Sequence, residues 1–449
     1  MLMRPRVRPT RLTVGIVSCL ALASGAVAET FDYGIDAGIA ETDNVSLLPG
    51  NTVSQTMAVA DFDFDFKQQT RLMDAALKGN FSYIDYLQHA YDRQLLGRFD
   101  GSGRFALIPE RLTWVVQDAF GQSVLDPFTP TTPNNLENVN YFSTGPDLAL
   151  RLGATGFLNA GARYARTTYA TSPFNSNRLQ ASLAAGLQLS ARSTVSLNAD
   201  NERVLFENTV INNDFDRTNA FVRYTLQGAR TDLSADLGAT RITQSDVSNS
   251  GPLVKLDLSR KLSGAAKLTA SAGRIFTDAS TSFSTLQTGA IGVVGVAPAA
   301  VTSETYTSDY ATVGWDYKRS RTTIDLSARW EKDDYANDPQ LDVKRDGAEF
   351  RFDRQVTRVF NAELLGRYYR TDYAHTFAEV VEGSPRYDDE LVAAVMTLRY
   401  GRGLEIKLRL EHDARVTSGF NNEYKDNRAF LTVGYRSNSA PPDIVDPGA

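Results

Sequence analysis

The sequence predicts an all-β chain that forms a transmembrane antiparallel up-and-down β-barrel, and three features lead to this fold class. Apolar and polar residues alternate along segments of about ten or more residues, whereas soluble strands usually have about five or six. The polar sides of these segments carry many charges, as a water-filled barrel interior tolerates. Short and long connections alternate along the chain, as they do in barrels of bacterial outer membranes.

The chain begins with a segment that has the anatomy of a secretory signal peptide, residues 1–28. Four arginines between Arg4 and Arg11 precede an apolar run from Leu12 to Ala23, and Ala26-Val27-Ala28 forms a small-x-small cleavage site. The apolar run is too short to cross a membrane as a helix. Removing these four positive charges would take the formal net charge from −6 to −10, and so acidic a chain argues against a nucleic-acid partner.

The only cysteine of the sequence, Cys19, lies inside this segment. We therefore expect a mature protein without disulfides, thiol catalysis or cysteine-bound metal. The alternative is a lipoprotein signal with Ile16-Val17-Ser18-Cys19 as the attachment box. Against it, only seven residues separate Arg11 from Cys19, and apolar sequence continues past the cysteine.

Residues 29–436 carry the alternating pattern from end to end and are expected to form one barrel. A period of two places all apolar side chains of a segment on one face of a strand. The pattern gives about 20 strands with both termini in the periplasm, and 18 strands is the alternative. Residues 437–449 contain three prolines and are expected to be a disordered tail. The clearest segments are 31–39, 58–66, 179–190, 324–331 and 404–411.

The connections between these segments fall into two classes, which we expect to be short periplasmic turns and long extracellular loops. Tight links are expected near 68–69, 109–110, 154–155, 191–192, 229–230, 263–264, 320, 356–357 and 401–402. Longer polar links are expected at 41–52, 122–142, 169–177, 207–216, 277–305, 333–344, 373–386 and 417–424.

Aromatic residues on the apolar faces cluster near the ends of the expected strands. Two aromatic girdles are what the two membrane interfaces favour, whereas a general preference of aromatics for strands does not predict clustering at strand ends. The girdles imply outer-membrane lipids and lipopolysaccharide as surroundings. The expected periplasmic girdle is Phe31, Tyr33, Phe66, Trp114, Trp315, Tyr317, Tyr400 and Tyr435, and the outer one is Tyr83, Tyr164, Trp330 and Tyr368.

The last alternating segment, from Ala429 to Tyr435, resembles the C-terminal assembly signal of outer-membrane barrels. The resemblance implies the barrel-assembly machinery as a partner. The sequence departs from that pattern in the 14 residues that follow Tyr435, since such signals usually end the chain.

A barrel of this size leaves an aqueous channel unless loops fill it. Most charges on its inner face are expected to form solvated cross-strand pairs. The acidic row Asp61, Asp63 and Asp65 stands out, because three carboxylates spaced by two on one wall repel one another unless cations or arginines face them. We expect this row to bias the pore toward cations, or against anionic polymers, as charged rings do.

The segment 122–142 has the most distinctive composition of the expected loops. Its amides offer donors and acceptors, and its aromatic rings offer flat faces, a combination that suits sugars in a contact or constriction loop. The alternative is a surface loop whose Asn and Pro residues satisfy one another in turns. The candidate residues are Asn134, Asn135, Asn138, Asn140, Tyr141 and Phe142.

The stretch from Trp114 to Leu152, with Glu41-Thr42-Asp43-Asn44-Val45 after the first strand, resembles the β-barrel porin family associated with exopolysaccharide and PEP-CTERM/exosortase systems. The resemblance lies in Gln117-Asp118, Gly121-Gln122 and the run from Asn138 to Pro146. It implies a passive outer-membrane conduit for exopolysaccharide export, with the polysaccharide and a periplasmic polysaccharide export protein as partners. A general or solute-specific porin for uptake is the alternative, and an outer-membrane hydrolase is a further one.

The residues argue against an enzyme, a cofactor or a bound metal. Some outer-membrane hydrolases keep a His/Ser pair on the outer face, and His412 shares the lipid-facing parity of its strand. Its nearest candidate serine, Ser418, lies on the following loop, and no triad is evident. The acidic loop from Asp333 to Asp342 lacks the spacing of a calcium loop.

Overall fold

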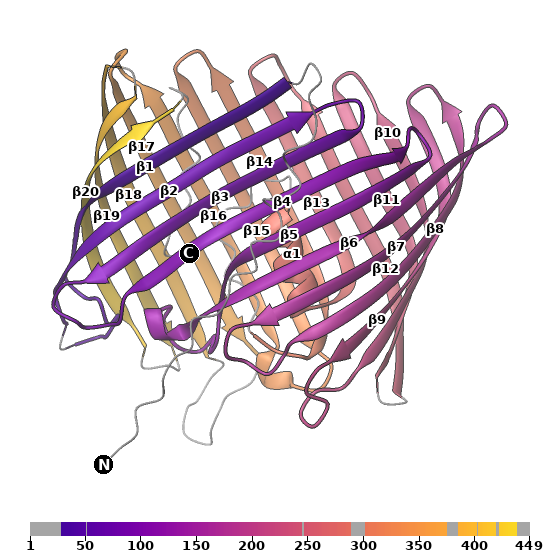
Figure 1. Cartoon of the computed structure of the whole chain (residues 1–449). Helices are drawn as coiled ribbons and strands as arrows, with labels where there is room; N and C mark the ends of the chain where they lie inside the picture. The colour runs from indigo at the N-terminus through magenta and orange to yellow at the C-terminus, as the bar shows by residue number, and fades with distance from the viewer. Residues whose placement is uncertain are drawn as a thin grey trace.

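A computed structural model shows the chain as a single closed barrel of 20 strands (Figure 1). It describes residues 28–50, 52–244, 247–288, 301–374, 385–401, 403–418 and 422–437. The expected signal peptide and tail lie outside these residues, apart from Ala28 and Ser437. The strands are β1 (Ala28–Thr42), β2 (Gln55–Gln69), β3 (Met73–Tyr86), β4 (Gln94–Ile108), β5 (Leu112–Val124), β6 (Leu136–Leu152), β7 (Gly156–Tyr169), β8 (Ser176–Ser190), β9 (Ser193–Phe206), β10 (Phe215–Gln227), β11 (Thr231–Gln244), β12 (Val247–Lys261), β13 (Ala266–Asp278), β14 (Thr305–Arg319), β15 (Thr322–Tyr335), β16 (Val343–Gln355), β17 (Phe360–Tyr373), β18 (Arg386–Tyr400), β19 (Leu404–Ser418) and β20 (Tyr424–Arg436).

Each strand pairs antiparallel with the next, and the last pairs with the first. Gly34–Thr42 of β1 lies opposite Arg428–Arg436 of β20, and this pairing closes the sheet. Closure leaves no strand edge, as spanning a membrane requires, because lipid cannot hydrogen-bond to exposed backbone groups. The prediction of 20 strands is therefore confirmed against the alternative of 18.

Short turns lie at one end of the barrel and longer connections at the other, at the top and bottom of Figure 1 respectively. The turns have two to four residues, as in 191–192 and 262–265, and the loops reach 26 residues in 279–304. The expected alternation breaks at one place, where only 245–246 separate β11 from β12 at the loop end. Both β1 and β20 have their free ends at the turn end.

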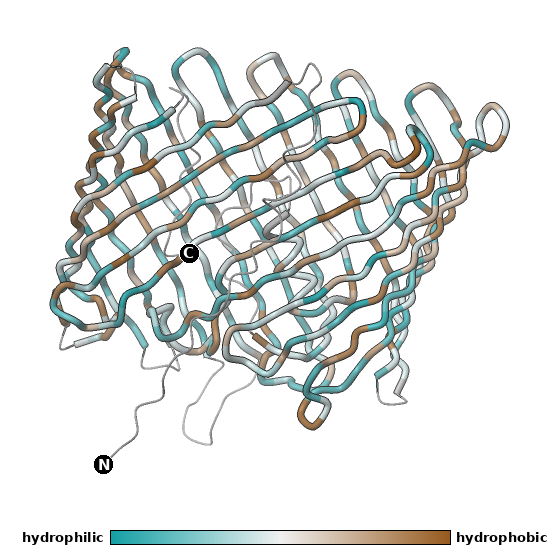
Figure 2. Tube along the Cα trace, in the orientation of Figure 1, coloured by the Kyte–Doolittle hydropathy of each residue, from teal (hydrophilic) through white to brown (hydrophobic). Residues whose placement is uncertain are grey.

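The outer face of the barrel is an apolar band. Large side chains that alternate toward the outside are exposed, as Leu197 is at 65 % and Leu237 at 68 %, and their strand neighbours are polar residues of the lumen. Figure 2 shows this alternation along strand after strand. At the turn end, the expected aromatic girdle includes Tyr33 and Tyr435, whose rings are 6.2 Å apart, and the stacked pair Trp315 and Tyr317.

A ring of outward-facing ion pairs, here named the outer collar, borders the apolar band at the loop end. Charges on a lipid-facing surface are tolerated near the interfaces and costly at the midplane, so the collar marks the edge of the hydrocarbon. The pairs are Arg93–Asp85, Arg166–Glu207, Arg203–Asp216, Arg274–Asp309, Lys332–Asp334, Lys344–Asp346, Arg370–Asp388 and Arg386–Asp372.

Buried apolar residues form several clusters at the loop end rather than one central core. Two of these clusters lie around segments that enter the lumen, one around Phe283 and one against Phe128. Within the described part of the chain, no helix is long and apolar enough to cross a membrane.

The inside–outside assignment predicts that two arginine substitutions on β11 differ in their effect on stability. Leu237→Arg places a charge in the apolar band and should lower the free energy of unfolding in lipid vesicles by about 2–4 kcal/mol. Ser234→Arg, on the lumen side opposite Asp257, should change it little. Denaturant unfolding of both variants measures the difference, and equal losses would contradict the assignment.

Candidate functional site: a constricted lumen

The predicted loop 122–142 is shorter in the structure. Strand β5 continues to Val124 and β6 begins at Leu136, so the loop is 125–135 and ends in a 3-10 turn, η2 (Pro133–Asn135). The expected bounds were wrong, because Glu137, Val139 and Tyr141 keep the alternation of a strand and pair with β5. A composition rich in Asn concealed that continuation.

The predicted sugar-contact residues are consequently divided between two faces. On the outer face, Asn140 donates to Asp118 at 2.9 Å, and Gln122 donates to Asn138 at 2.8 Å. Phe142 has the same outward parity, whereas Tyr141 points into the lumen, opposite Ala119. These residues do not form one sugar-binding surface.

Asn135 stabilises the loop itself. Its Nδ2 donates to the carbonyls of Asp126 at 2.8 Å and Pro130 at 3.1 Å, and its Oδ1 accepts from the Asp126 amide at 2.8 Å. The side chain is buried, while its neighbour Asn134 is exposed. For Asn135, the alternative of a self-satisfied loop describes the structure better than sugar contact.

Loop 125–135 folds into the barrel and reaches the opposite wall. The ring of Phe128 lies 4.7 Å from that of Tyr373 on β17, whose hydroxyl donates to the Pro127 carbonyl at 3.4 Å. Asn422, before β20, donates to the Phe128 carbonyl at 2.5 Å. The loop therefore narrows the lumen and does not project outward.

A helix that the sequence analysis did not predict, α1 (Ala279–Thr288), also lies inside the barrel (Figure 1). It follows β13 directly and contacts β4, β5 and β6. Its Phe283 is buried against Ala119, Val139 and Tyr169. Two segments from different parts of the chain thus occupy the lumen near its loop end.

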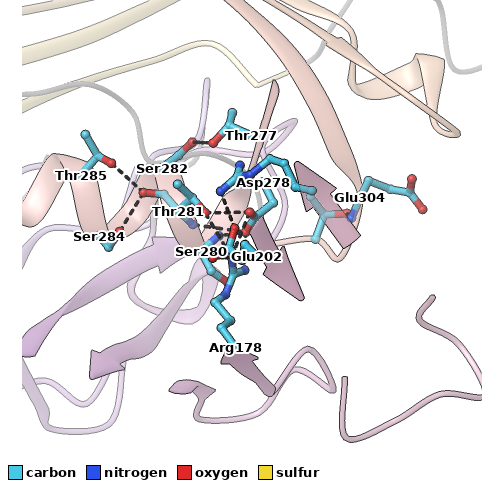
Figure 3. A network of polar contacts seen from close by, with 12 residues as sticks. Arg178, Glu202, Thr277, Asp278, Ser280, Thr281, Ser282, Ser284, Thr285 and Glu304 are labelled. Atoms are coloured by element: carbon cyan, nitrogen blue, oxygen red, sulfur yellow. Dashed lines mark hydrogen bonds and ion pairs between the residues drawn. The ribbon is translucent and has the colours of Figure 1, made fainter. Parts of the chain in front are cut away.

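A buried charge network, here named the latch, holds α1 in place (Figure 3). Arg178 on β8 is 1 % exposed and donates to both carboxylate oxygens of Asp278, at 3.1 and 2.5 Å. Asp278 also caps α1, because it accepts from the amides of Ser280 and Thr281 at 3.1 and 3.2 Å. Glu202 on β9 completes the network by pairing with Arg178 and with Arg217 of β10.

Sequence signals for the latch were present but weak. Asp278 precedes the Ser/Thr-rich start of α1, an arrangement typical of a helix N-cap. Arg178 has lumen-facing parity on a strand whose alternation is clear, but parity does not identify its partner 100 residues away.

The acidic row Asp61, Asp63 and Asp65 faces the lumen, as its parity predicts. Asp63 receives two hydrogen bonds from Arg436, at 2.8 and 3.0 Å, Asp61 accepts from Ser82, and Asp65 pairs with Lys67 at 3.1 Å. These partners relieve the expected repulsion and weaken the expected cation bias.

His412 faces outward, as expected from its parity. Its Nδ1 lies 2.7 Å from Oδ1 of Asn427, whose amide donates to Asp43 at 2.7 Å. Burial acts to raise the pKa of Asp43, but the hydrogen bonds from Asn427 outweigh it and hold that pKa below its ordinary value.

Ser418 lies in β19, six residues and about 20 Å along the strand from His412, too far to be activated by it. Among the described residues no cluster of His, Cys, Asp or Glu could hold a metal ion.

Several solved outer-membrane transporters resemble the barrel at low similarity. The FrpB iron transporter from Neisseria meningitidis is 9% identical over 90% of this chain and 82% of that one, with a TM-score of 0.45. The copper transporter OprC is 12% identical over 92% of this chain and 81% of that one, with a TM-score of 0.45. The siderophore receptor PirA from Pseudomonas aeruginosa is 11% identical over 90% of this chain and 80% of that one, with a TM-score of 0.40. No protein-family model and no curated protein matches the sequence.

The closed barrel, its apolar outer band and its charged lumen define the protein as an outer-membrane β-barrel channel. Structural similarities this distant do not indicate which molecules the barrel transports. The association with exopolysaccharide systems rests on the sequence resemblance alone.

The role of Asn135 predicts a contrast between two adjacent asparagines. Asn135→Ala removes the bonds that organise loop 125–135 and should cost about 1–3 kcal/mol locally, so the loop should become more susceptible to limited proteolysis. Asn134→Ala, at an exposed position, should behave as the wild type. Equal protection of the loop in both variants would contradict this role.

Proposed function

We propose that this outer-membrane barrel is a passive channel for the uptake of small polar solutes. The observation that carries the proposal is the entry of loop 125–135 and α1 into the lumen. A 20-stranded barrel without such segments encloses a wide aqueous channel. With both segments inside, the lumen admits only molecules much smaller than the barrel diameter. This restriction suits selective uptake of solutes better than passage of a polymer.

The proposed orientation places the long loops outside the cell and both termini in the periplasm. The outer collar supports it, because an array of paired charges suits the phosphates and sugars of lipopolysaccharide in the outer leaflet. The turn end lacks such a ring among the described residues and carries aromatic side chains instead.

Export of exopolysaccharide is the second candidate function, and its support is the sequence resemblance between Trp114 and Leu152. The narrowed lumen weighs against it, unless both internal segments move aside. A deletion strain that still secretes normal polysaccharide would rule out a required role in export, whereas loss of secretion would favour it over solute uptake.

The channel is tested directly by conductance of the purified full-length protein in planar bilayers. We expect steady current steps smaller than those of a variant in which residues 126–134 are replaced by a short Gly/Ser linker. A protein that gives no current at any voltage would contradict the proposal, since a sealed barrel transports nothing passively.

The latch predicts a second change in conductance. Asp278→Ala removes the cap of α1 and leaves Arg178 without its main partner, a loss of about 3–5 kcal/mol for a buried pair. The helix should leave its site, and conductance should rise. Asp257→Ala on β12 is the control. Asp257 is a lumen carboxylate that accepts from Ser271 and has no part in the latch, so this variant should conduct like the wild type. Equal conductance of the two variants would mean that α1 does not restrict the pore.

A further inference from the structure

A cavity of about 120 Å³ lies on the far side of loop 125–135, between the loop and the lumen wall formed by β15 to β20. It has two unlike walls. The wall formed by the loop and the adjoining ends of β5 and β6 is mainly apolar, with Val124, Pro127 and Leu136 beside Thr129 and Thr131. The strand wall carries tyrosines and paired charges. A void of this kind fits a molecule with an apolar body and a polar head.

Arg415 on β19 is the most informative residue of the strand wall. Its side chain is 5 % exposed, and its guanidinium lies over the ring of Tyr387, 4.0 Å from the centroid. Asp389 accepts from its Nε at 2.6 Å and from its Nη2 at 3.0 Å. The bidentate pair fixes the plane of the guanidinium and therefore the direction of its remaining donor.

That remaining donor, Nη1 of Arg415, is buried and has no hydrogen-bond partner among the described residues. The same holds for Nε of Arg329, which lines the same cavity and whose Nη2 donates to Glu331 at 2.8 Å. A buried donor of a charged group without an acceptor is costly. Two such donors at one void indicate a ligand that supplies acceptor oxygens.

The inward-facing carboxylates of the cavity wall already have arginine partners, including Asp413 with Arg428, which favours a ligand that accepts hydrogen bonds over a sugar. Asp389 is occupied by Arg415, and Glu331 accepts from Arg329. Sugar hydroxyls need acceptors as well as donors, whereas a carboxylate only accepts. Five arginines but only three inward-facing carboxylates line the void, because the side chain of Asp346 belongs to the outer collar. The balance of charge therefore also favours an anion.

The size of the void limits the body of the ligand. A cavity of about 150 Å³ lined by apolar residues holds a benzene molecule. This void is smaller but not fully enclosed, so a ligand with one ring can lie partly within it. We propose that the cavity is a binding site for a small organic carboxylate with an apolar body no larger than a single aromatic ring. The inference rests on the proposed function and names the class of solute that the channel selects.

Calorimetric titration of the detergent-solubilised full-length protein with benzoate tests the site, and benzyl alcohol serves as the neutral molecule with the same ring. Benzoate should bind saturably and benzyl alcohol should not. Arg415→Lys keeps the charge opposite Asp389 but lacks the planar third donor, and it should weaken benzoate binding by about tenfold or more. Arg329→Lys provides a second variant if the first fails to fold.

Arg399→Lys is the matched control. Arg399 also faces the lumen and pairs with a carboxylate, Glu405 at 2.9 Å, but it lies at the turn end of β18, away from the cavity. This variant should bind benzoate as the wild type does. Equal binding of benzyl alcohol, unaltered affinity in the Arg415 and Arg329 variants, or no binding of benzoate would each overturn the inference.

Conductance separates failure of this inference from failure of the channel. A protein that conducts ions but does not bind benzoate would retain the proposed function and lose the carboxylate site. A protein that binds benzoate but never conducts would retain the site and lose the channel.

Discussion

Closure of the backbone hydrogen-bond ladder is the constraint on which the rest of the structure depends. Lipid offers no hydrogen bonds, so every amide and carbonyl of the spanning strands must find its partner in a neighbouring strand. The pairing of β1 with β20 satisfies the last two edges. It also brings the first and last strands together, and for this reason Asp63 on β2 pairs with Arg436 at the end of β20.

Once the ladder is closed, the strands surround a lumen that is too wide, at this barrel size, for their inward-facing side chains to fill. The protein occupies part of that space with its own loop 125–135 and α1. Polar contacts attach both segments: Tyr373 donates to the loop, and Arg178 donates to Asp278 at the helix. One ring of each segment also packs against the wall, the partly buried Phe128 and the buried Phe283.

Much of the barrel was predictable from local pattern. Period-two alternation gave the inward and outward faces correctly for residues as different as Asp61 and Leu404, because one face must be wet and the other lipid-facing. The interior was harder to predict. Residues 279–288 have only Phe283 and Leu286 as large apolar residues, so no helical periodicity was visible, and the helix depends on contacts with strands distant in sequence. The Asn-rich segment misled in a similar way, because composition suggested a loop where Val139 and Tyr141 continue a strand.

The width of the apolar band also determines which bilayer suits the protein. On β11 the outward residues are apolar from Leu233 to Ala239, and the next outward residue is Arg241. At about 3.3 Å per residue and a tilt of about 40°, the six steps from Leu233 to Ala239 cover roughly 15 Å of membrane thickness. Hydrophobic mismatch would therefore disfavour a thick bilayer, in which charged side chains would be drawn below the headgroups. The stability of this barrel therefore depends on the thickness of the membrane around it and should be highest in a thin bilayer.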